Sequence, residues 1–247
     1  MIDKPIEVSK SVFILGDDHC VSVKSGKGRL FNVRAEGVSI SMDGVKLSFD
    51  GESVPIETPL SALTSIEMQG CTIEAGSDEG KIVNFAQGGP VRYEFVNNTV
   101  SVLSRGLLVN VYNGSRIVDN EIDVLSEHYS DAYRTGAISL TAVSGGDGVE
   151  IKGNTFKNAN RVLGVDHAAI EGTKIAFSKN KMVNCRFAFE FDPRNEGVEN
   201  ADAGTYDIEY NYYSFDGKAM APRVEDASSS GSHFDARLNM YQLVRLA

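Results

Sequence analysis

The sequence predicts an all-β protein in which short strands and turns form a coil that repeats along one axis. A short motif recurs along most of the chain, and an apolar segment with two-residue alternation follows most copies of it. Side chains of a strand point alternately to its two faces, so this alternation is typical of strands. The composition agrees, because 24 glycines, 6 prolines and no tryptophan among 247 residues suit strands and turns better than long helices.

The recurring motif is an apolar residue, two further residues, an asparagine, any residue and a second apolar residue. Two early copies keep the apolar frame but carry Asp43 and Cys71 at the asparagine position. Neighbouring copies are 22 to 34 residues apart, a variable step that is typical of stacked coils with extra residues in outer loops. The five copies with asparagine are Phe95–Val100, Ile117–Ile122, Ile151–Phe156, Phe177–Met182 and Ile208–Tyr213.

The apolar segments between the motif copies are further predicted strands. In the segment Phe187–Asp192, three phenylalanines alternate with other residues and therefore share one face. No segment shows the spacing of an amphipathic helix over a useful length, so a helix is a poor interpretation. The predicted strands are Arg29–Val33, Ile82–Ala86, Leu107–Tyr112, Ala137–Val143, Arg161–His167 and Phe187–Asp192.

Stacked coils explain why asparagine recurs. One coil cannot bury its apolar face alone, whereas stacked coils share a continuous core and place like residues on like. A buried asparagine in a turn can form hydrogen bonds with the asparagines above and below it through its amide. We therefore predict a structural ladder of Asn98, Asn120, Asn154, Asn180 and Asn211. Cys71 is expected in the interior, and the cysteines Cys20, Cys71 and Cys185 are interpreted as small buried fillers.

The motif copies GNTFKNA, KNKMVNC and NNTVSVL resemble the repeats of right-handed parallel β-helix proteins of the pectate-lyase-like superfamily. The resemblance runs from about Leu30 to Phe215 and implies a single-stranded right-handed parallel β-helix of about seven to nine coils. The segment NYYSFDGKAMAP resembles the closing stretch of bacterial adhesin-like surface β-helix proteins. We expect residues 1–217 to form the β-helix and residues 218–247 to form a C-terminal loop and capping segment, because exposed strand edges must be blocked.

Charge and hydropathy restrict the partners. The chain has 24 Lys and Arg against 34 Asp and Glu, a formal net charge of −10. This excess argues against nucleic acid, whose binding requires basic residues, and against an anionic membrane surface. The chain has no apolar run of about 18 residues, so the sequence predicts no membrane span, and the N-terminus has no apolar signal core. The resemblance implies an extracellular or cell-surface protein, and we expect a monomer.

Polar residues of three successive coils form the candidate site. The insertion at residues 126–136 is rich in histidine, tyrosine and charged residues, and stacking would bring the next two coils to the same side. Arginine can neutralise a uronate carboxylate, while histidine or tyrosine can take the proton alpha to it. The candidate residues are His128, Tyr129, Asp131, Tyr133, Arg134, Asp166, His167, Arg186, Asp192 and Arg194.

We prefer a non-catalytic module that binds a glycan or a host or matrix partner, because no catalytic motif set of the family is present. The alternative is a polysaccharide lyase or glycoside hydrolase acting on a uronate-containing polysaccharide, with Tyr133, Arg134 and His167 as catalytic residues. The module needs no cofactor, whereas a lyase could use calcium held by acidic residues. The four histidines are too scattered to predict a metal site. A third interpretation is a structural stalk within a longer surface protein.

Overall fold

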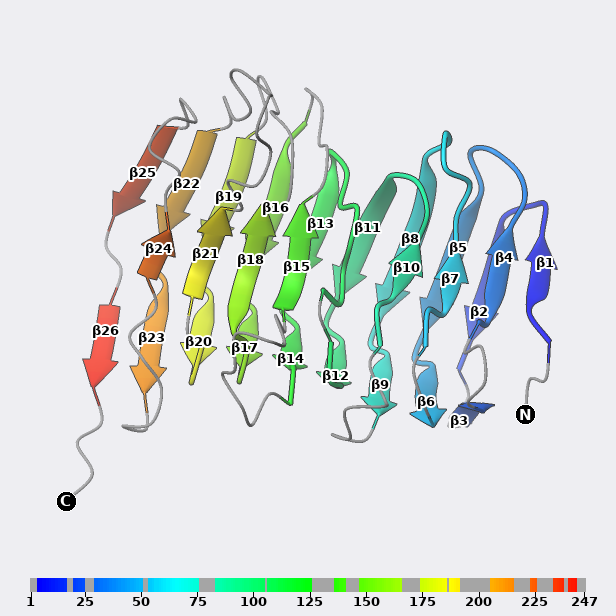
Figure 1. Ribbon diagram of the computed structural model, residues 1–247, viewed down its shortest axis with the longest axis horizontal. Coiled ribbons are helices and arrows are strands. Elements are labelled where there is room, and N and C mark those ends of the chain that lie inside the picture. Colours follow the sequence, from blue (N-terminus) through cyan, green and yellow to red (C-terminus); the bar gives the residue numbers. More distant parts are fainter. Residues whose placement is uncertain are drawn as a thin grey trace.

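The chain folds into short parallel strands that stack along one long axis (Figure 1). In the residues that the structure describes, it forms 26 strands and no helix. Every strand pairing among them is parallel, as in the pair β8–β11. The computed structural model describes residues 4–16, 20–24, 29–50, 53–75, 83–104, 106–125, 136–140, 147–165, 174–185, 187–191, 205–215, 223–225, 233–237 and 240–243.

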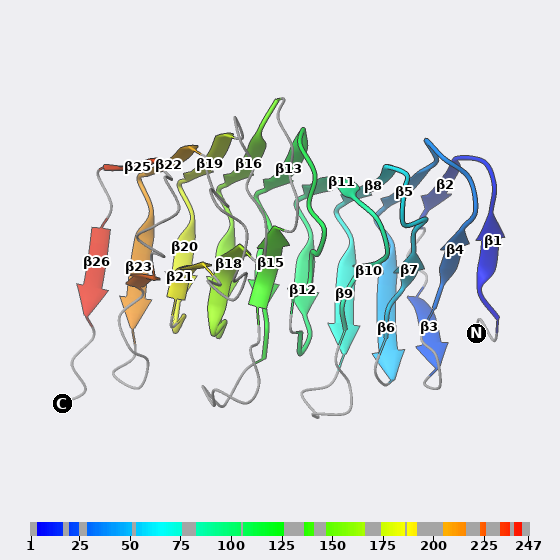
Figure 2. The ribbon, with the colours of Figure 1, turned by 45° about the horizontal axis from the view of Figure 1, so that its top comes forward.

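Two long sheets run along the molecule (Figure 2). Each contains nine strands. The first long sheet consists of β2 (Val12–Leu15), β5 (Ser39–Asp43), β8 (Thr64–Gln69), β11 (Val91–Val96), β13 (Ser115–Val118), β16 (Val149–Lys152), β19 (Lys174–Ser178), β22 (Thr205–Glu209) and β25 (His233–Arg237). The second long sheet consists of β3 (Cys20–Lys24), β6 (Lys46–Asp50), β9 (Thr72–Ala75), β12 (Thr99–Ser101), β14 (Glu121–Asp123), β17 (Thr155–Lys157), β20 (Lys181–Val183), β23 (Tyr212–Phe215) and β26 (Met240–Leu243).

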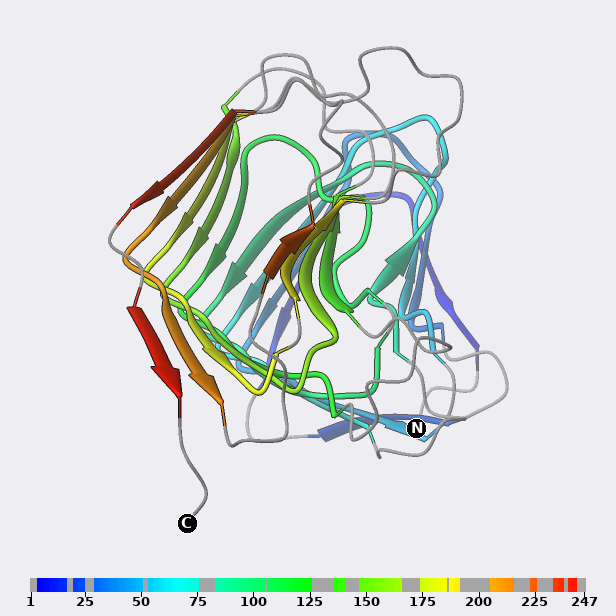
Figure 3. The ribbon, with the colours of Figure 1, turned by 60° about the vertical axis from the view of Figure 1, so that its left-hand side comes forward.

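The third side of the coil is divided between two sheets of four strands each. Figure 3 shows the three sides around a common interior. The N-terminal short sheet contains β1 (Ile6–Val8), β4 (Phe31–Val33), β7 (Ile56–Glu57) and β10 (Ala86–Gln87). The C-terminal short sheet contains β15 (Gly136–Leu140), β18 (Arg161–Val165), β21 (Phe187–Phe191) and β24 (Arg223–Glu225).

The order of the strands confirms the predicted right-handed parallel β-helix. The chain passes from a short-sheet strand to the first long sheet, turns a tight corner into the second long sheet and returns to the third side. Each strand pairs with its equivalent about one coil later, as the repeat predicted. Strands β24, β25 and β26, which fall within residues 218–247, extend three of the sheets in the same way.

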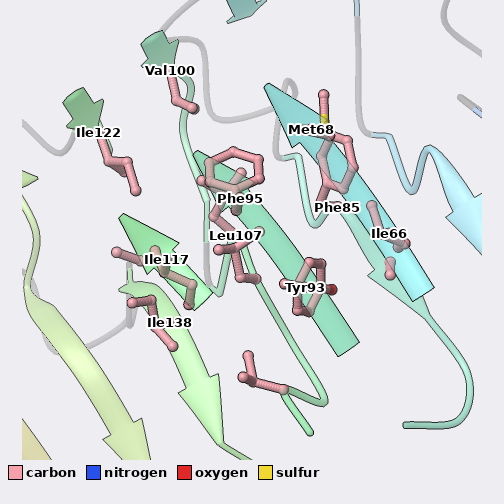
Figure 4. Packing of buried hydrophobic residues seen from close by; sticks show 14 of the residues in the cluster. Ile66, Met68, Phe85, Tyr93, Phe95, Val100, Leu107, Ile117, Ile122 and Ile138 are labelled. Atoms are coloured by element: carbon pink, nitrogen blue, oxygen red, sulfur yellow. The ribbon is translucent and has the colours of Figure 1, made fainter. Parts of the chain in front are cut away.

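Inward-facing side chains form one continuous apolar core. Strand β11 alternates buried and more exposed residues, and its Tyr93 and Phe95 point inward with Ile66 of β8 and Ile117 of β13 (Figure 4). The Tyr93 hydroxyl donates a hydrogen bond to the carbonyl oxygen of Val109 at 3.0 Å. This bond satisfies the buried phenol, whose pKa is raised by its removal from water.

The tight corner between the two long sheets contains the asparagine ladder. All five predicted asparagines are buried, with at most 2% of each residue exposed. From Asn98 to Asn180, each Nδ2 donates to the Oδ1 of the next asparagine, for example from Asn120 to Asn154 at 2.8 Å and from Asn154 to Asn180 at 3.0 Å. The same nitrogen also donates to a backbone carbonyl, which for Asn154 is that of Ile117 at 2.8 Å. These bonds satisfy both amide hydrogens away from water.

The ladder also satisfies the backbone of the corner. The Oδ1 of each next asparagine accepts the backbone N–H of the preceding one, as Asn154 does from Asn120 at 3.0 Å. The residue before each asparagine has a positive φ, for example 54° at Asn97 and 55° at Asp119. This left-handed conformation turns the chain within two residues, and Asn and Asp adopt it more readily than most residues do.

The first copies of the motif differ from the others at this corner. Cys71 is buried, and its Sγ lies 3.5 Å from the carbonyl oxygen of Met42, in the role that the Asn98 Nδ2 has toward Met68. The assignment of Asp43 to the asparagine position was wrong. Asp43 pairs with Gln69 on the strand before the corner, and the corner position belongs to the buried Val45. The predicted copy began two residues too early, because Met42 pairs with Met68 and Leu47 pairs with Ile73.

Removal of one ladder amide should destabilise the fold strongly. Asn154→Ala should lower the free energy of unfolding by about 2–4 kcal/mol, because it leaves the buried N–H groups of Asn120 and the carbonyl of Ile117 without partners. Urea denaturation measures this loss. Thr155→Ala, on the outer face next to it, is the matched control and should cost less than about 1 kcal/mol. Equal losses in the two variants would show that the ladder does not stabilise the corner.

The buried thiols should be unreactive. Cys71 and Cys185 are free and buried. Burial raises the pKa of the Cys71 thiol, and it raises the pKa of the Cys185 thiol to about 12. Because the thiolate is the nucleophile, iodoacetamide at about pH 8 should modify neither until urea unfolds the chain. Mass spectrometry of peptides measures the modification. A Ser101→Cys variant supplies a half-exposed control thiol, and equal rates at positions 101 and 185 would contradict the expectation.

Candidate functional site

The candidate site residues taken from the sequence lie outside the described part of the chain. This applies to all ten of them: His128, Tyr129, Asp131, Tyr133, Arg134, Asp166, His167, Arg186, Asp192 and Arg194. The structure does describe the C-terminal short sheet, whose strands border the segments containing these residues. The pairing of that sheet shows where the described ends of the segments lie.

The described ends of these segments lie at two opposite edges of the C-terminal short sheet. Gly136, the last residue of the insertion, begins β15 and pairs with Arg161. Val165 and Phe191, which precede Asp166 and Asp192 in the sequence, pair with each other at the carboxyl ends of their strands. A strand of five residues rises about 3.3 Å per residue, so about 13 Å separates the two edges.

A buried arginine lies within this sheet and was not selected from the sequence. Arg161 is only 6% exposed, although arginine is rarely buried. Its guanidinium lies against Gly164, where a Cβ would come within 2.7 Å of the Arg161 Cζ. Glycine at position 164 therefore makes room for the guanidinium. Ser139, which pairs with Gly164, and Asn160 are buried as well. The apolar character of the surrounding strand segment concealed this polar group in the sequence.

The outer face of the first long sheet contains a row of polar and charged side chains, which we call the charged row. The row follows the strand register through Ser41, Glu67, Glu94, Arg116 and Glu150. The Ser41 Oγ donates to Glu67 Oε2 at 2.7 Å, at one end of the row. Such a row exists because equivalent outward positions of parallel strands lie about 4.8 Å apart.

Arg116 links the carboxylates on its two sides. Its Nη1 lies 2.5 Å from Glu94 Oε1, and its Nε lies 3.1 Å from Glu150 Oε2. The hydrogen bond to Glu150 and the charge of Glu94 raise the pKa of Arg116 above its ordinary value. The guanidinium therefore stays charged and is held in place between strands β11 and β16. About half of the Arg116 side chain (51%) remains exposed, so a ligand can still reach it.

Neither a metal site nor a membrane span is found among the described residues. No group of three or more His, Cys, Asp or Glu side chains there is arranged to hold a metal ion. The described part of the chain also has no helix of the length and apolarity needed to cross a membrane. No protein-family model matches the chain, and no curated protein or solved structure matches it. Any functional conclusion therefore depends on the surfaces of the described strands.

The ion pairs of the charged row should contribute little to stability. Because Arg116 and its partners are about half exposed, Arg116→Ala should lower the free energy of unfolding by less than about 1 kcal/mol. Urea denaturation at low and high salt measures the effect, which salt should reduce further. Lys46→Ala, which removes the exposed pair with Glu74 on the second long sheet, is the control. A loss far above that of the control would mean that the row is part of the structural framework.

Proposed function

We propose that this chain is a non-catalytic β-helix module of an extracellular or cell-surface protein, and that it binds a glycan or a host or matrix protein. The charged row is the observation that carries the proposal. It presents hydroxyl, carboxylate and guanidinium groups at a regular spacing along the axis, and the ion pairs of Arg116 hold part of the row in place. Fixed donors and acceptors bind an extended partner with less loss of side-chain entropy than mobile ones do.

The charge of the row favours some partners over others. Arg116 shares the row with three carboxylates, Glu67, Glu94 and Glu150. Lys152 Nζ lies 3.8 Å from Glu150, so an excess of one carboxylate remains. Together with the net charge of −10, this excess repels a polyanion. A neutral glycan or a basic protein surface is therefore the better partner for this face. The resemblance of the motifs to the pectate-lyase-like superfamily, which includes bacterial surface adhesins, supports the same proposal.

A second candidate function is a polysaccharide lyase or glycoside hydrolase with Tyr133, Arg134 and His167 as catalytic residues. One observation favours it: Val165 and Phe191, the sequence neighbours of Asp166 and Asp192, are paired in the C-terminal short sheet. Acidic residues that follow adjacent strands are a suitable start for a calcium site, and calcium could assist a lyase. A uronate substrate would need several arginines gathered at one place to overcome the net negative charge.

Binding and turnover experiments distinguish the two functions. The chain should bind members of a glycan array or a panel of matrix proteins, and it should release no unsaturated products from uronate-containing polysaccharides with or without calcium. Product formation, followed by absorbance, would refute the non-catalytic proposal and favour the lyase. A folded chain that binds neither glycans nor matrix proteins would also refute the proposal.

A charge reversal tests which face binds. Arg116→Glu should weaken the binding of a neutral glycan at least about tenfold, because it removes the guanidinium donor and the ion pairs that hold Glu94 and Glu150 in place. Lys46→Glu makes the same change of charge on the second long sheet and should leave the affinity within about twofold. Equal affinities of the two variants would show that the first long sheet is not the binding face.

A further inference from the structure

The outer face of the N-terminal short sheet contains a second polar row. Strand register aligns Glu7 of β1, Asn32 of β4, Glu57 of β7 and Gln87 of β10. These strands lie at the N-terminal end of the coil, on the right in Figure 1. On β4 the flanking Phe31 and Val33 belong to the core, so the alternation directs Asn32 outward, with its Nδ2 bonded to the exposed Glu7.

Two ion pairs flank Asn32. Arg34, two residues after it, places its Nε 2.6 Å from Glu7 Oε2. Arg29, three residues before it, places its Nη1 2.5 Å from Glu57 Oε2. The Asn32 Nδ2 itself donates to Glu7 Oε1 at 2.9 Å. The two carboxylates and two guanidiniums thus surround one asparagine and balance each other in charge.

The other end of the Asn32 amide is the unusual feature. Asn32 is only 7% exposed, and its Oδ1 is buried without a hydrogen-bond donor. A buried acceptor without a partner is costly, and native structures rarely retain one without a reason. The orientation of the amide is fixed, because the carboxylate of Glu7 can accept a hydrogen bond only from the NH₂ group. The Oδ1 has almost no exposed surface of its own, so a donor reaches it only where one of the partly exposed ion-paired side chains beside it moves aside.

The surrounding charges restrict what this donor can be. A metal cation would need carboxylates that are not already paired, and a uronate or phosphate would need a guanidinium that is not already paired. Glu7 and Glu57 are each paired with an arginine. A neutral ligand with adjacent hydroxyl groups fits instead. One hydroxyl can donate to Asn32 Oδ1, and the adjacent hydroxyl can accept from a guanidinium N–H and donate to a carboxylate.

We propose that Glu7, Asn32 and Glu57, with Arg29 and Arg34, form a binding site for a neutral sugar ring with adjacent hydroxyl groups. This site rests on the glycan-binding form of the proposed function and adds a contact point and a ligand class to it. The hydrogen bonds from Arg34 and Asn32 lower the pKa of Glu7, so this carboxylate stays charged at neutral pH. Binding should therefore weaken when acidification protonates Glu7.

Nuclear magnetic resonance on the ¹⁵N-labelled full chain tests the site. Methyl glycosides of glucose, galactose and mannose are titrated separately, with glucuronate as the charged comparison. At least one neutral glycoside should shift the side-chain amide resonances of Asn32, which Asn32→Ala identifies by their loss, and glucuronate should bind at least tenfold more weakly. Shifts with glucuronate that equal or exceed those with every neutral sugar would overturn the assignment of the ligand class.

Matched variants locate the contact. Asn32→Ala and Glu57→Gln should each weaken binding of the neutral glycoside at least tenfold, whereas Glu74→Gln, which alters an exposed ion pair on the second long sheet, should leave the affinity unchanged. Thermal unfolding verifies that each variant is folded. If Asn32→Ala does not fold, the titration of the native chain with neutral glycosides and glucuronate tests the site instead. Unchanged affinity in a folded Asn32→Ala variant would contradict the site.

The outcomes separate this site from the broader function. If the chain binds glycans on an array but no sugar moves the Asn32 resonances, the site is wrong while the binding function stands. If only acidic glycans bind, the neutral ligand class is wrong and the function again stands. If neither glycans nor matrix proteins bind to the folded chain, the function itself fails, and the site fails with it.

Discussion

The hydrogen bonds between stacked asparagines fix the geometry on which the rest of the molecule depends. From Asn98 to Asn180, each amide links its own coil to the next one through an asparagine oxygen and to the previous one through a backbone carbonyl, and so determines which residue lies above which at the corner. A shift of one residue would turn the strand faces inside out, because side chains alternate along a strand. In the coils that carry the ladder, the register of the long sheets and the inward or outward direction of their side chains follow from this corner.

The asparagine ladder does not extend through the whole β-helix. Toward the N-terminus Cys71 and then Val45 occupy the corner, and the amide contacts give way to a thiol and an apolar side chain. Apolar packing and backbone hydrogen bonds suffice there, as in the bond from Thr72 N–H to the Val45 carbonyl. The asparagines therefore add polar specificity to a stack that apolar burial already favours.

The stacking that buries the core also builds the candidate binding surfaces. Parallel register converts one outward residue per coil into a row, in which neighbours are about 4.8 Å apart and pair by charge. On the first long sheet the row leaves an excess of carboxylates around Arg116, whereas on the N-terminal short sheet the charges around Asn32 balance. The two rows therefore suit different ligands, although the same repeat generates both.

The sequence by itself determined the all-β coil, the buried interior and the asparagine ladder, because each depends on a local repeat in which burial selects the same residue type in every coil. It misplaced Asp43, since the apolar frame also fits Ile40–Val45, two residues before the true copy Met42–Leu47. The tertiary structure alone decided which polar residues meet across coils. Glu7 and Asn32 are 25 residues apart, and variable loops make such register invisible until the coils stack. Arg161 was concealed because it stands in an apolar strand segment, and its burial depends on the space that Gly164 leaves for the guanidinium within the fold.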